Sequence, residues 1–329
     1  MEFIQIPKDS PEILKAYRLF RNAVRDGDIL CKEICREEFQ SKFIDRENGI
    51  AKVNIIEKEG WAFASGCIDQ KMGKSYITMV TVERSKRRKG LGRKILYKLE
   101  EELSEIDHKS DFEISFFNPM SLKWLLPEKN GVEHPNMPGV DVSSAAYLFF
   151  KNCGYRDFAM QNSYYISLNH YEYPSEMAAN KKKLLQDEFT LERYHESLHS
   201  GMADMMRKFG NPLWEKEILE EPSIDHGGRP ILVPVYADRV CGFTGPLDVE
   251  KTGRGYFAGI GTDPDFRGHG LAKLMFCELC SELKKLGAEY MTLFTGEQNP
   301  ARNIYEAAGF HIVRSWADMR KTHKEDVLR

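Results

Sequence analysis

Two stretches of this chain place apolar residues four positions apart, and both stretches have similar surroundings. The first stripe consists of Leu91, Ile95, Leu99 and Leu103, and the second of Leu271, Met275, Leu279 and Leu283. Side chains at this spacing share one face of an α-helix, so each stripe predicts a helix that buries that face. Apolar or alternating stretches flank each helix, at 75–82 and 112–117 in the first place and at 255–262 and 290–295 in the second. The pattern therefore predicts strand, helix and strand twice.

The two places form an internal repeat. Residues 87–92 read RRKGLG, and residues 267–272, which lie 180 positions later, read RGHGLA. This offset exceeds the period of solenoid repeats, so duplication of a whole domain is the simplest explanation. We expect an N-terminal domain at 1–175 and a C-terminal domain at 176–329, which act as a pseudo-dimer within one chain. The oligomeric state of the whole protein stays open.

Each copy continues with a second helix that ends at a turn glycine, at 145–152 before Gly154 and at 301–308 before Gly309. The first copy is about 25 residues longer between its glycine turn and this helix. The extra residues, 119–143, are rich in Pro and Gly, and we expect them to fold over a cleft.

The composition is that of a globular chain whose partners are small molecules. Its 329 residues, 42% of them hydrophobic and 29% charged, suffice for two domains. A formal net charge of −3 argues against a binder of nucleic acids or anionic membranes. The chain begins without a secretory pattern and has no stretch apolar enough to span a membrane, so we expect a cytoplasmic protein. The seven cysteines, an odd number, predict reduced thiols, and no pattern predicts a metal site.

The repeated glycine turns carry the chemistry. A strand that leads through Arg-x-x-Gly-x-Gly/Ala into a helix leaves backbone N–H groups unpaired at the positive end of the helix dipole. Gly90 and Gly270 let a ligand approach the backbone, and Arg87 and Arg267 add positive charge. The combination predicts an anion site suited to a pyrophosphate. Neither copy has the nucleoside-triphosphate loop G-x-x-x-x-G-K-[ST], and G-x-G-x-x-G fails at Lys273.

The second copy reads GIGTDPDFRGHGLAKL over 259–274, YMTLF over 290–294 and NPARNIYEAAGF over 299–310. This order resembles the signature of the GNAT (Gcn5-related N-acetyltransferase) superfamily, and its doubling is similar to mycothiol-synthase-like double GNAT proteins. The resemblance implies an α/β fold (α+β mixed sheet) that consists of two tandem GNAT folds. Each implied fold has a mixed, mostly antiparallel central sheet with flanking helices and a splayed pair of fourth and fifth strands.

The resemblance also implies that acetyl-CoA, as co-substrate, binds along this signature. Its pyrophosphate would lie on the turn, and its pantetheine arm would run along the preceding strand and meet Asn299. The other implied binding residues are Ile260, Gly261, Thr262, Arg267, Gly268, His269, Gly270, Leu271 and Ala272. Tyr305 is the implied general acid that protonates the departing thiolate. The residues alone leave two plainer interpretations open, a core aromatic for Tyr305 and a helix cap for Asn299.

Three carboxylates are candidates for a general base. An amine attacks only when it is unprotonated, so a base or a water chain must remove a proton. Asp248 and Glu250 precede the strand that carries Ile260, and Glu297 follows the strand expected beside it. Backbone N–H groups near Ile260 or Gly261 are expected to polarise the thioester carbonyl.

The first copy keeps the glycine turn but loses the catalytic position. Ser144 stands where the second copy has Asn299, and Phe150, which cannot donate a proton, stands where it has Tyr305. The turn makes this copy a candidate second CoA site, with residues Val82, Arg87, Arg88, Lys89, Gly90, Leu91 and Gly92. We expect this domain to be catalytically degenerate, and Tyr147, one turn earlier, to substitute only if the thioester were displaced.

We therefore predict an acetyl-CoA-dependent N-acyltransferase that transfers an acetyl group to a primary amine of a small molecule by a direct ternary-complex mechanism. The first alternative is a non-catalytic protein that binds or senses acyl-CoA, and the second is an acetyltransferase of protein amines. The segment 201–214, with Met202, Met205, Met206 and Trp214, is either helix core or part of an apolar acceptor site. The sequence does not fix the acceptor, because variable loops build acceptor pockets.

Overall fold

The computed structural model describes residues 2–108, 111–116, 118–126, 131–136 and 139–322. Contacts divide the chain into two compact units. The first unit runs to Asn162 and takes up the chain again from Arg314, and the second unit is Ser163–Val313. Each unit is described by itself below.

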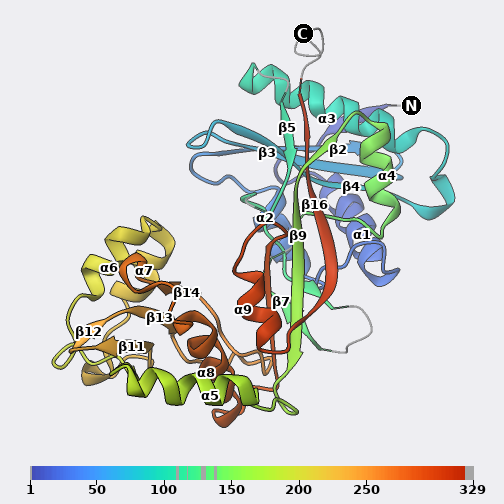
Figure 1. The fold of residues 1–329 in the computed structure, drawn as a ribbon. Coiled ribbons are helices and arrows are strands. Elements are labelled where there is room, and N and C mark those ends of the chain that lie inside the picture. Colours follow the sequence, from blue (N-terminus) through green and yellow to red (C-terminus); the bar gives the residue numbers. More distant parts are fainter. Residues whose placement is uncertain (1, 109–110, 117, 127–130, 137–138, 323–329) are drawn as a thin grey trace, which may run out of the picture. The chain divides into compact units, whose positions relative to one another are not determined.

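The helices and strands occupy the following ranges, which can be followed in Figure 1. The α-helices are α1 (Glu12–Arg25), α2 (Arg36–Phe43), α3 (Leu91–Asp107), α4 (Ala145–Asn152), α5 (Ser175–Gln186), α6 (Met202–Phe209), α7 (Pro212–Leu219), α8 (Leu271–Lys285) and α9 (Arg302–Ala307), and the 3-10 helices are η1 (Arg84–Lys86), η2 (Ile224–His226) and η3 (Pro264–Phe266). The strands are β1 (Phe3–Gln5), β2 (Ile50–Glu57), β3 (Ala62–Asp69), β4 (Lys74–Val82), β5 (Phe112–Ile114), β6 (Trp124–Leu125), β7 (Glu133–His134), β8 (Val140–Asp141), β9 (Arg156–Ser167), β10 (Thr190–Arg193), β11 (Leu232–Tyr236), β12 (Arg239–Val240), β13 (Gly242–Gly245), β14 (Gly259–Thr262), β15 (Tyr290–Gly296) and β16 (His311–Lys321).

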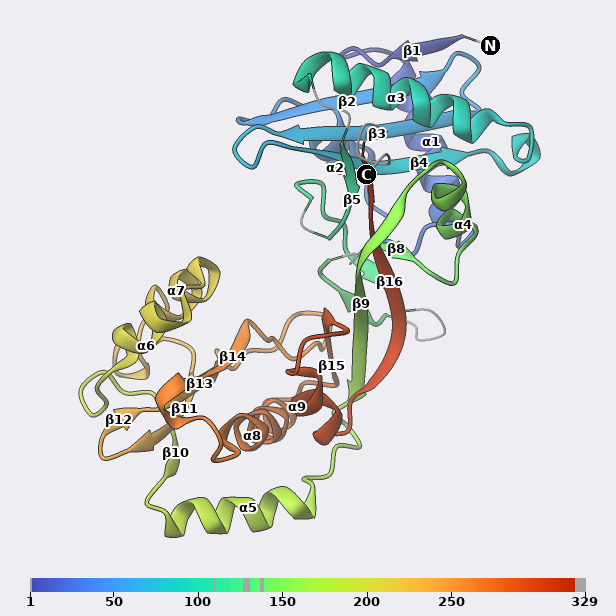
Figure 2. The ribbon, with the colours of Figure 1, turned by 45° about the horizontal axis from the view of Figure 1, so that its top comes forward.

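The first unit is a sheet covered by helices on both faces. Its strands follow the order β1-β2-β3-β4-β5-β16-β9, and β8 pairs with β16. The pairing of β4 with β5 is parallel, whereas β1 to β4 pair antiparallel. Figures 1 and 2 show α3 on one face of β2, β3 and β4 and α1 with α2 on the other.

Side-chain alternation along the strands builds the two halves of this core. In β2 and β3, Ile55 and Ala64 pack in the cluster of α3, whereas Ile56 and Phe63 pack in the cluster of α1 and α2. Successive side chains of a strand point to opposite faces, so a sheet buried on both faces needs apolar residues in succession. The strand sequences of this unit meet that need.

The second unit holds its strands in two groups. The order β10-β11-β13-β14 leaves β14 at one edge, and β15 is the neighbour of β9 instead. The approach to β14 meets β15 in parallel only at Arg254 and Tyr290. Beyond that point no ladder pair joins β14 to β15, both of which the structure describes fully. The two strands therefore splay, as Figure 2 shows.

Helices cover both faces of the second unit too. Ile260 of β14 belongs to the apolar cluster of α8, while Phe243 of β13 belongs to the cluster of α6 and α7. Gly259 and Gly261 leave room for two aromatic rings, because a Cβ there would lie 2.4 Å from Trp214 Nε1 and 2.7 Å from Phe209 Cζ. Met202, Met205 and Met206 are buried in the α6 cluster, which favours the core interpretation of the 201–214 segment.

The predicted fold class is confirmed, and most predicted elements lie where the sequence pattern put them. All eight residues of the two apolar stripes are buried on α3 and α8. The strand predicted at 255–262 is shorter, beginning at Gly259, because the Tyr256 amide turns away to bond the Asp248 carbonyl at 2.9 Å. The strand predicted at 112–117 corresponds to β5, which covers Phe112–Ile114.

The predicted domain ranges, 1–175 and 176–329, stay a prediction. The predicted ranges came from the sequence repeat, whereas the two units are defined by contacts. The second unit begins at Ser163, and the chain returns to the first unit at Arg314. The reason lies in β9 and β16, since each of these long strands begins in one unit and ends in the other.

The expected lid over a cleft, 119–143, includes 127–130 and 137–138, which lie outside the described residues. Its described parts hold β6, β7 and β8 and bond the segment after α1, where the Lys32 amide donates to the Lys123 carbonyl at 2.7 Å. This finding does not test the role expected for the insertion.

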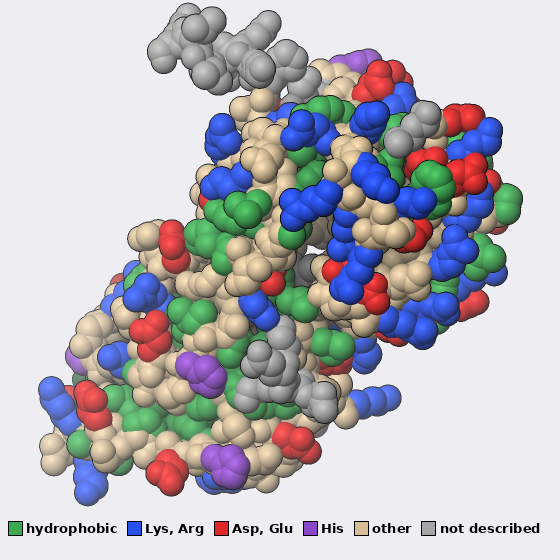
Figure 3. Space-filling view, turned by 90° about the vertical axis from the view of Figure 1, so that its right-hand side faces the viewer, with side chains coloured by type: hydrophobic (Ala, Val, Ile, Leu, Met, Phe, Trp, Pro, Cys, Tyr) green, Lys and Arg blue, Asp and Glu red, His purple; other side chains and the backbone are tan. Residues whose placement is uncertain are grey.

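The surface drawn in Figure 3 mixes both signs of charge, with Lys and Arg side chains numerous over the first unit and interspersed with Asp and Glu. A near balance of 47 basic and 50 acidic residues agrees with this mixture. Within the described ranges, no helix is long and apolar enough to cross a membrane.

The repeat makes a matched stability test available. Leu99 and Leu279 occupy the same repeat position and are fully buried. We expect Leu99→Ala and Leu279→Ala each to lower the free energy of unfolding by about 2–5 kcal/mol, because each leaves a cavity. Urea titration measures the loss. As a control, Leu286→Ala just after α8, where the side chain is 54% exposed, should change the value by less than about 0.5 kcal/mol; equal effects of Leu279→Ala and Leu286→Ala would contradict the assigned core.

Candidate functional site

The turn before α8 is where the sequence predicted an anion site. The chain leaves η3, passes Arg267 in an extended conformation, and then has positive φ at Gly268 (90°) and Gly270 (78°). These left-handed conformations suit glycine, which has no Cβ to clash. The amides of residues 268–272 have no hydrogen-bond partner in the described chain. They form a row of free donors at the positive end of the α8 dipole.

The side chains of this turn differ in what they offer. Arg267 is exposed and makes no ion pair with any described residue, so its guanidinium is free for a ligand. His269 is exposed as well, and its ring lies 5.1 Å from that of Phe189. Leu271 and Ala272 point into apolar clusters, so these two residues can offer only their backbone to a ligand.

The open edge of β14 supplies a second row of backbone groups. The Asp263 amide donates to the Cys241 carbonyl on the β13 side at 2.9 Å, in register with the β13–β14 ladder. Hydrogen-bonding directions alternate along a strand, so Gly261 also bonds toward β13, while Ile260 and Thr262 direct their amides to the open edge. The Thr262 hydroxyl is buried without a hydrogen-bond partner. A ligand lying along this edge would find unpaired donors and acceptors.

Tyr305 lies in an aromatic cluster close to this edge. Its ring is 5.0 Å from that of Phe276 on α8 and 6.2 Å from that of Phe257, which precedes β14. The Tyr305 side chain is buried within the apolar cluster that includes Ile260, yet no described residue accepts a hydrogen bond from its hydroxyl. Burial raises the pKa of Tyr305 to about 12. The hydroxyl therefore keeps its proton at neutral pH and is free to donate it.

Asn299 lies in the turn that precedes α9. Its side-chain oxygen accepts a hydrogen bond from the Ala301 amide at 3.0 Å, and the side chain is exposed. The helix-cap interpretation is wrong, because Ala301 is the N-cap of α9 and no side chain caps this helix. The amide nitrogen of Asn299 has no described partner and could offer two N–H groups to a ligand.

The three candidate bases differ in their partners. Glu250 is held by Arg254 at 2.7 Å, and Asp248 accepts from Arg229 at 3.1 Å. The carboxylate of Glu297 has no partner among the described residues, since Arg302 bonds only its carbonyl at 3.3 Å. A carboxylate already hydrogen-bonded to arginine has fewer lone pairs left for a substrate, so the geometry favours Glu297.

The glycine turn of the first unit has the same backbone but not the same freedom. Arg88 and Gly90 have positive φ, 62° and 78°. Here, however, the Arg87 guanidinium pairs with Asp28 at 2.5 Å and also donates to the Val82 carbonyl at 2.8 Å. The hydrogen bond from Arg87 lowers the pKa of Asp28 despite partial burial, so this carboxylate is ionised at neutral pH. The Asp28 carboxylate therefore already neutralises Arg87, the arginine that a phosphate would need.

Other predicted residues of the first turn are also engaged. The Lys89 ammonium lies 3.5 Å from the Ser85 carbonyl, and Leu91 is buried. A Cβ at Gly92 would lie 3.2 Å from the Phe149 ring, so this ring covers the start of α3. Phe150 is buried in the α3 cluster, as its apolar character requires.

In the first unit, Tyr147 was the residue considered as a substitute for the proton donor that Phe150 cannot be. It donates to Asp157 at 2.6 Å and accepts from Lys151 at 3.1 Å. A phenol in this network is not free to protonate a leaving group.

Two contacts of the second turn were missed by the sequence analysis. Asp263, between β14 and η3, is fully buried and accepts two hydrogen bonds from Lys208 of α6. Asn180 of α5 lies beside Gly270, where a Cβ would be 2.9 Å from its Nδ2 atom. The Asp-Pro sequence at 263–264 was a readable signal for a helix cap. No signal in the sequence pointed to Lys208 or Asn180, because both are brought to the turn by tertiary packing.

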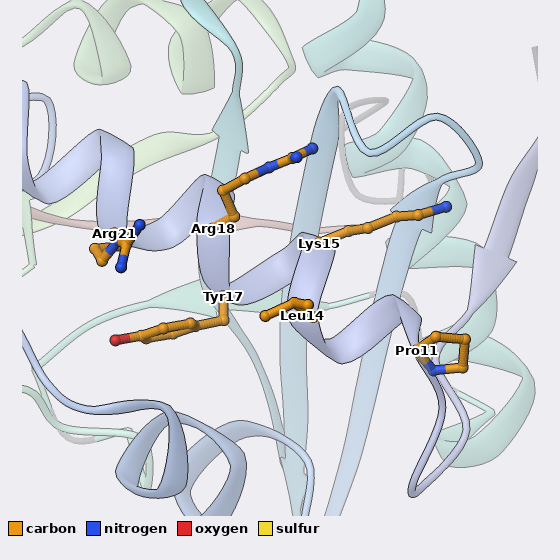
Figure 4. Close-up of a pocket in the computed structure, with 6 residues that line it drawn as sticks. All are labelled: Pro11, Leu14, Lys15, Tyr17, Arg18 and Arg21. Atoms are coloured by element: carbon orange, nitrogen blue, oxygen red, sulfur yellow. The ribbon is translucent and has the colours of Figure 1, made fainter.

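Two hollows of the described surface lie one in each unit. The one drawn in Figure 4 belongs to the first unit, measures about 350 Å³ and is lined by Pro11 and by side chains along α1. A smaller one lies between α5 and the first turn of α8. Among the described residues, no group of three His, Cys, Asp or Glu side chains is arranged to hold a metal ion.

Comparison with known proteins finds a family that matches the part of the chain that contains this turn. Residues 194–310 match the acetyltransferase (GNAT) family, a stretch that contains β14, the glycine turn, α8 and Tyr305. The mycothiol acetyltransferase of Thermobifida fusca is 29% identical over 106 residues, which are 29% of this chain and 32% of that protein. The match thus spans about a third of that relative's length.

Solved structures share the fold along nearly the whole chain. The glucosamine N-acetyltransferase region of a fungal multi-domain β-N-acetylglucosaminidase has a TM-score of 0.62 at 14% identity, over 97% of this chain and 38% of that one. A GNAT protein of Sphaerobacter thermophilus has a TM-score of 0.60 at 16% identity, over 97% and 95%. A tandem GNAT protein from the clavulanic acid biosynthesis pathway has a TM-score of 0.55 at 13% identity, over 97% of both chains.

Identities this low show the fold alone, whereas the family match carries the signature residues themselves. Residues 194–310 belong to the acetyltransferase (GNAT) family, within a chain that has the tandem GNAT fold.

Proposed function

We propose that this protein is an acetyl-CoA-dependent N-acyltransferase whose catalytic half is the second unit. The observation that carries the proposal is the arrangement of unpaired groups along one path. Free amides and a free Arg267 at the turn are followed by an open strand edge and then by the unpartnered hydroxyl of Tyr305. The names of the mycothiol acetyltransferase and glucosamine N-acetyltransferase relatives support acetyl transfer as the reaction class.

The chain's own residues fit the parts of acetyl-CoA in order. The amides of residues 268–272 and the Arg267 guanidinium suit the pyrophosphate. The Ile260 and Thr262 backbone groups, with the amide of Asn299, suit the amide-rich pantetheine arm. When bound, the thioester supplies an acetyl group that is already activated for transfer.

Tyr305 and Glu297 would handle the protons of the reaction. The amine nitrogen forms a bond to the acetyl carbon, the carbon–sulfur bond breaks, and Tyr305 gives its proton to the departing sulfur. This step demands little of the acid, since a thiol of pKa about 8.5 leaves readily as its anion. Glu297 accepts the proton that the attacking amine loses, directly or through water, and the amides at the β14 edge polarise the carbonyl.

The first unit would serve without binding acetyl-CoA. The Asp28 carboxylate neutralises Arg87, the Phe149 ring covers Gly92, and Phe150 has no proton to give. We therefore interpret it as an accessory half, and we expect one acetyl-CoA site per chain rather than two.

The acceptor we propose is the primary amine of a small molecule. An amino sugar is the first acceptor to test, because one structural relative is described as a glucosamine N-acetyltransferase region. Binding of acetyl-CoA without turnover on any small amine would favour a sensor, and turnover only on peptides would favour a protein acetyltransferase.

Calorimetric titration with acetyl-CoA tests the binding half of the proposal. The wild-type protein should bind one equivalent, and Arg267→Ala should weaken binding about tenfold or more, because one charge-assisted hydrogen bond contributes about 1.5–3 kcal/mol. Arg87→Ala is the matched control from the first repeat and should leave the affinity within about twofold, its guanidinium being paired with Asp28. Two equivalents per chain would refute the accessory role, and no binding would refute the proposal.

Substitution of Tyr305 tests the chemical step. Tyr305→Phe keeps the ring in its aromatic cluster and removes the proton donor, so kcat should fall about tenfold to hundredfold while acetyl-CoA affinity stays near the wild-type value. Release of free thiol with an amino-sugar acceptor measures kcat. Tyr164→Phe is the control, because its ring also touches the cluster but its hydroxyl is bonded to Glu306. An unchanged kcat in Tyr305→Phe would remove this residue from the mechanism.

The pH dependence of kcat follows from the raised pKa of Tyr305. A general acid works in its protonated form, so a pKa of about 12 keeps Tyr305 competent throughout the neutral and alkaline range. We expect kcat to rise with pH as the amine loses its proton, without a falling limb between about pH 7 and 10. A falling limb in this range that disappears in Tyr305→Phe would contradict the raised pKa while keeping Tyr305 as the acid, and a falling limb that persists in Tyr305→Phe would come from another group. Circular dichroism at each pH excludes unfolding.

A further inference from the structure

A buried carboxylate lies at the junction between the open strand edge and the glycine turn of the second unit. Asp263 follows the last residue of β14 and precedes η3, and its side chain is fully buried. One carboxylate oxygen accepts from Lys208 at 2.9 Å and from the Asp265 amide at 3.1 Å. The other accepts from Lys208 at 3.0 Å and from Arg239 at 3.4 Å.

This set of partners keeps the carboxylate ionised. Burial alone would raise the pKa of Asp263, but the hydrogen bonds and positive charges of Lys208 and Arg239, with the Asp265 amide, hold it below its ordinary value. A buried ion is tolerated only with such partners, so the carboxylate and its cations fix one another's positions. The backbone of Asp263 is fixed as well, since its amide donates to Cys241 and its carbonyl accepts from Phe266.

Lys208 and Arg239 reach the turn from two other elements. Lys208 is on α6, where the next residue, Phe209, packs against Gly261 of β14. Its ammonium also contacts Asp265 at 2.6 Å. Arg239 is on β12, with its guanidinium 5.7 Å from the Phe266 ring. The entrance to the glycine turn is therefore held from α6, β12 and β14 at the same time.

The first unit lacks this arrangement and reverses its charges. Glu83 stands at the repeat position of Asp263, and its side chain is exposed and accepts only from the Ser85 hydroxyl in the described chain. The acidic partner comes instead from the segment after α1, where Asp28 pairs with Arg84 and Arg87. In the second unit the anion is Asp263, which precedes the turn, and its cation is Lys208 on α6. These two residues pair with each other, and Arg267 stays unpaired among the described residues.

We propose that Asp263 is a positioning residue for acetyl-CoA, which presets the turn at 264–270 and keeps Arg267 free for the pyrophosphate. This inference rests on the proposed function. A turn that is already ordered does not lose conformational freedom when the ligand binds, so the benefit appears as affinity for the cofactor. It does not appear in the chemical step, because Asp263 is buried and touches neither reacting group.

The test is the effect of Asp263→Asn on acetyl-CoA binding and on the split between KM and kcat. The substitution keeps the shape and removes the charge that holds Lys208 and Arg239. We expect the Kd and KM for acetyl-CoA to rise about tenfold, the ratio that corresponds to one charge-assisted hydrogen bond. At saturating acetyl-CoA, kcat and the KM for the amine should stay within about twofold. Glu83→Gln is the matched control from the first repeat and should change nothing.

A second pair of variants keeps the inference testable if Asp263→Asn fails to fold. The Lys208 side chain is one-third exposed, so changes there are easier to accommodate. Lys208→Met should reproduce the loss of acetyl-CoA affinity, and Lys208→Arg, which keeps a cation beside Asp263, should restore it to within about threefold. Melting temperatures without ligand identify any variant that is merely unfolded.

The outcomes separate this inference from the proposed function. Folded Asp263→Asn and Lys208→Met proteins with unchanged acetyl-CoA affinity would overturn the positioning role and leave the acyltransferase proposal intact. A fall in kcat at unchanged KM would also overturn it. Wild-type protein that binds no acetyl-CoA would overturn the proposed function itself, and the positioning role with it.

Discussion

The separation of β14 from β15 is the constraint on which the proposed site depends. The chain contacts β15 in parallel at Arg254 and Tyr290, before β14 begins at Gly259. Arg254 is buried, bonds the Thr292 carbonyl of β15 at 3.2 Å and has its charge balanced by Glu250. This ion pair, with its arginine buried, fixes the approach to β14 against β15. Beyond it β14 continues as an edge strand, and its backbone groups on the side away from β13 have no partner strand.

The same constraint gives the aromatic cluster its position. Phe257 leaves the line of the sheet before β14 begins, and its ring packs with Phe276 and Tyr305. Tyr305 thus lies in an apolar setting that raises the pKa of its hydroxyl, which stays protonated at neutral pH. The strand separation and the position of this aromatic cluster both follow from one local departure from regular pairing.

The two repeats share a backbone but surround it with different charges. Their glycine turns agree in conformation, with positive φ at both corresponding positions of each turn. They differ in where the charges are, since Asp28 neutralises Arg87 in the first unit while Lys208 and Asp263 neutralise each other in the second. The two turns thus share a backbone conformation and differ in the ion pairs around it.

The sequence by itself determined the local elements, because helical spacing and turn glycines are properties of neighbouring residues. It therefore predicted α3 and α8 with a glycine turn before each, and its resemblance to a family signature singled out Tyr305. Only the tertiary structure decided which charges are free, since Asp28, Lys208 and Asn180 reach the turns from distant segments. Tertiary structure also decided the units, because β9 and β16 change over between them. Contacts between residues far apart in the chain leave no periodic trace in a single sequence, and for that reason the folded chain alone reveals them.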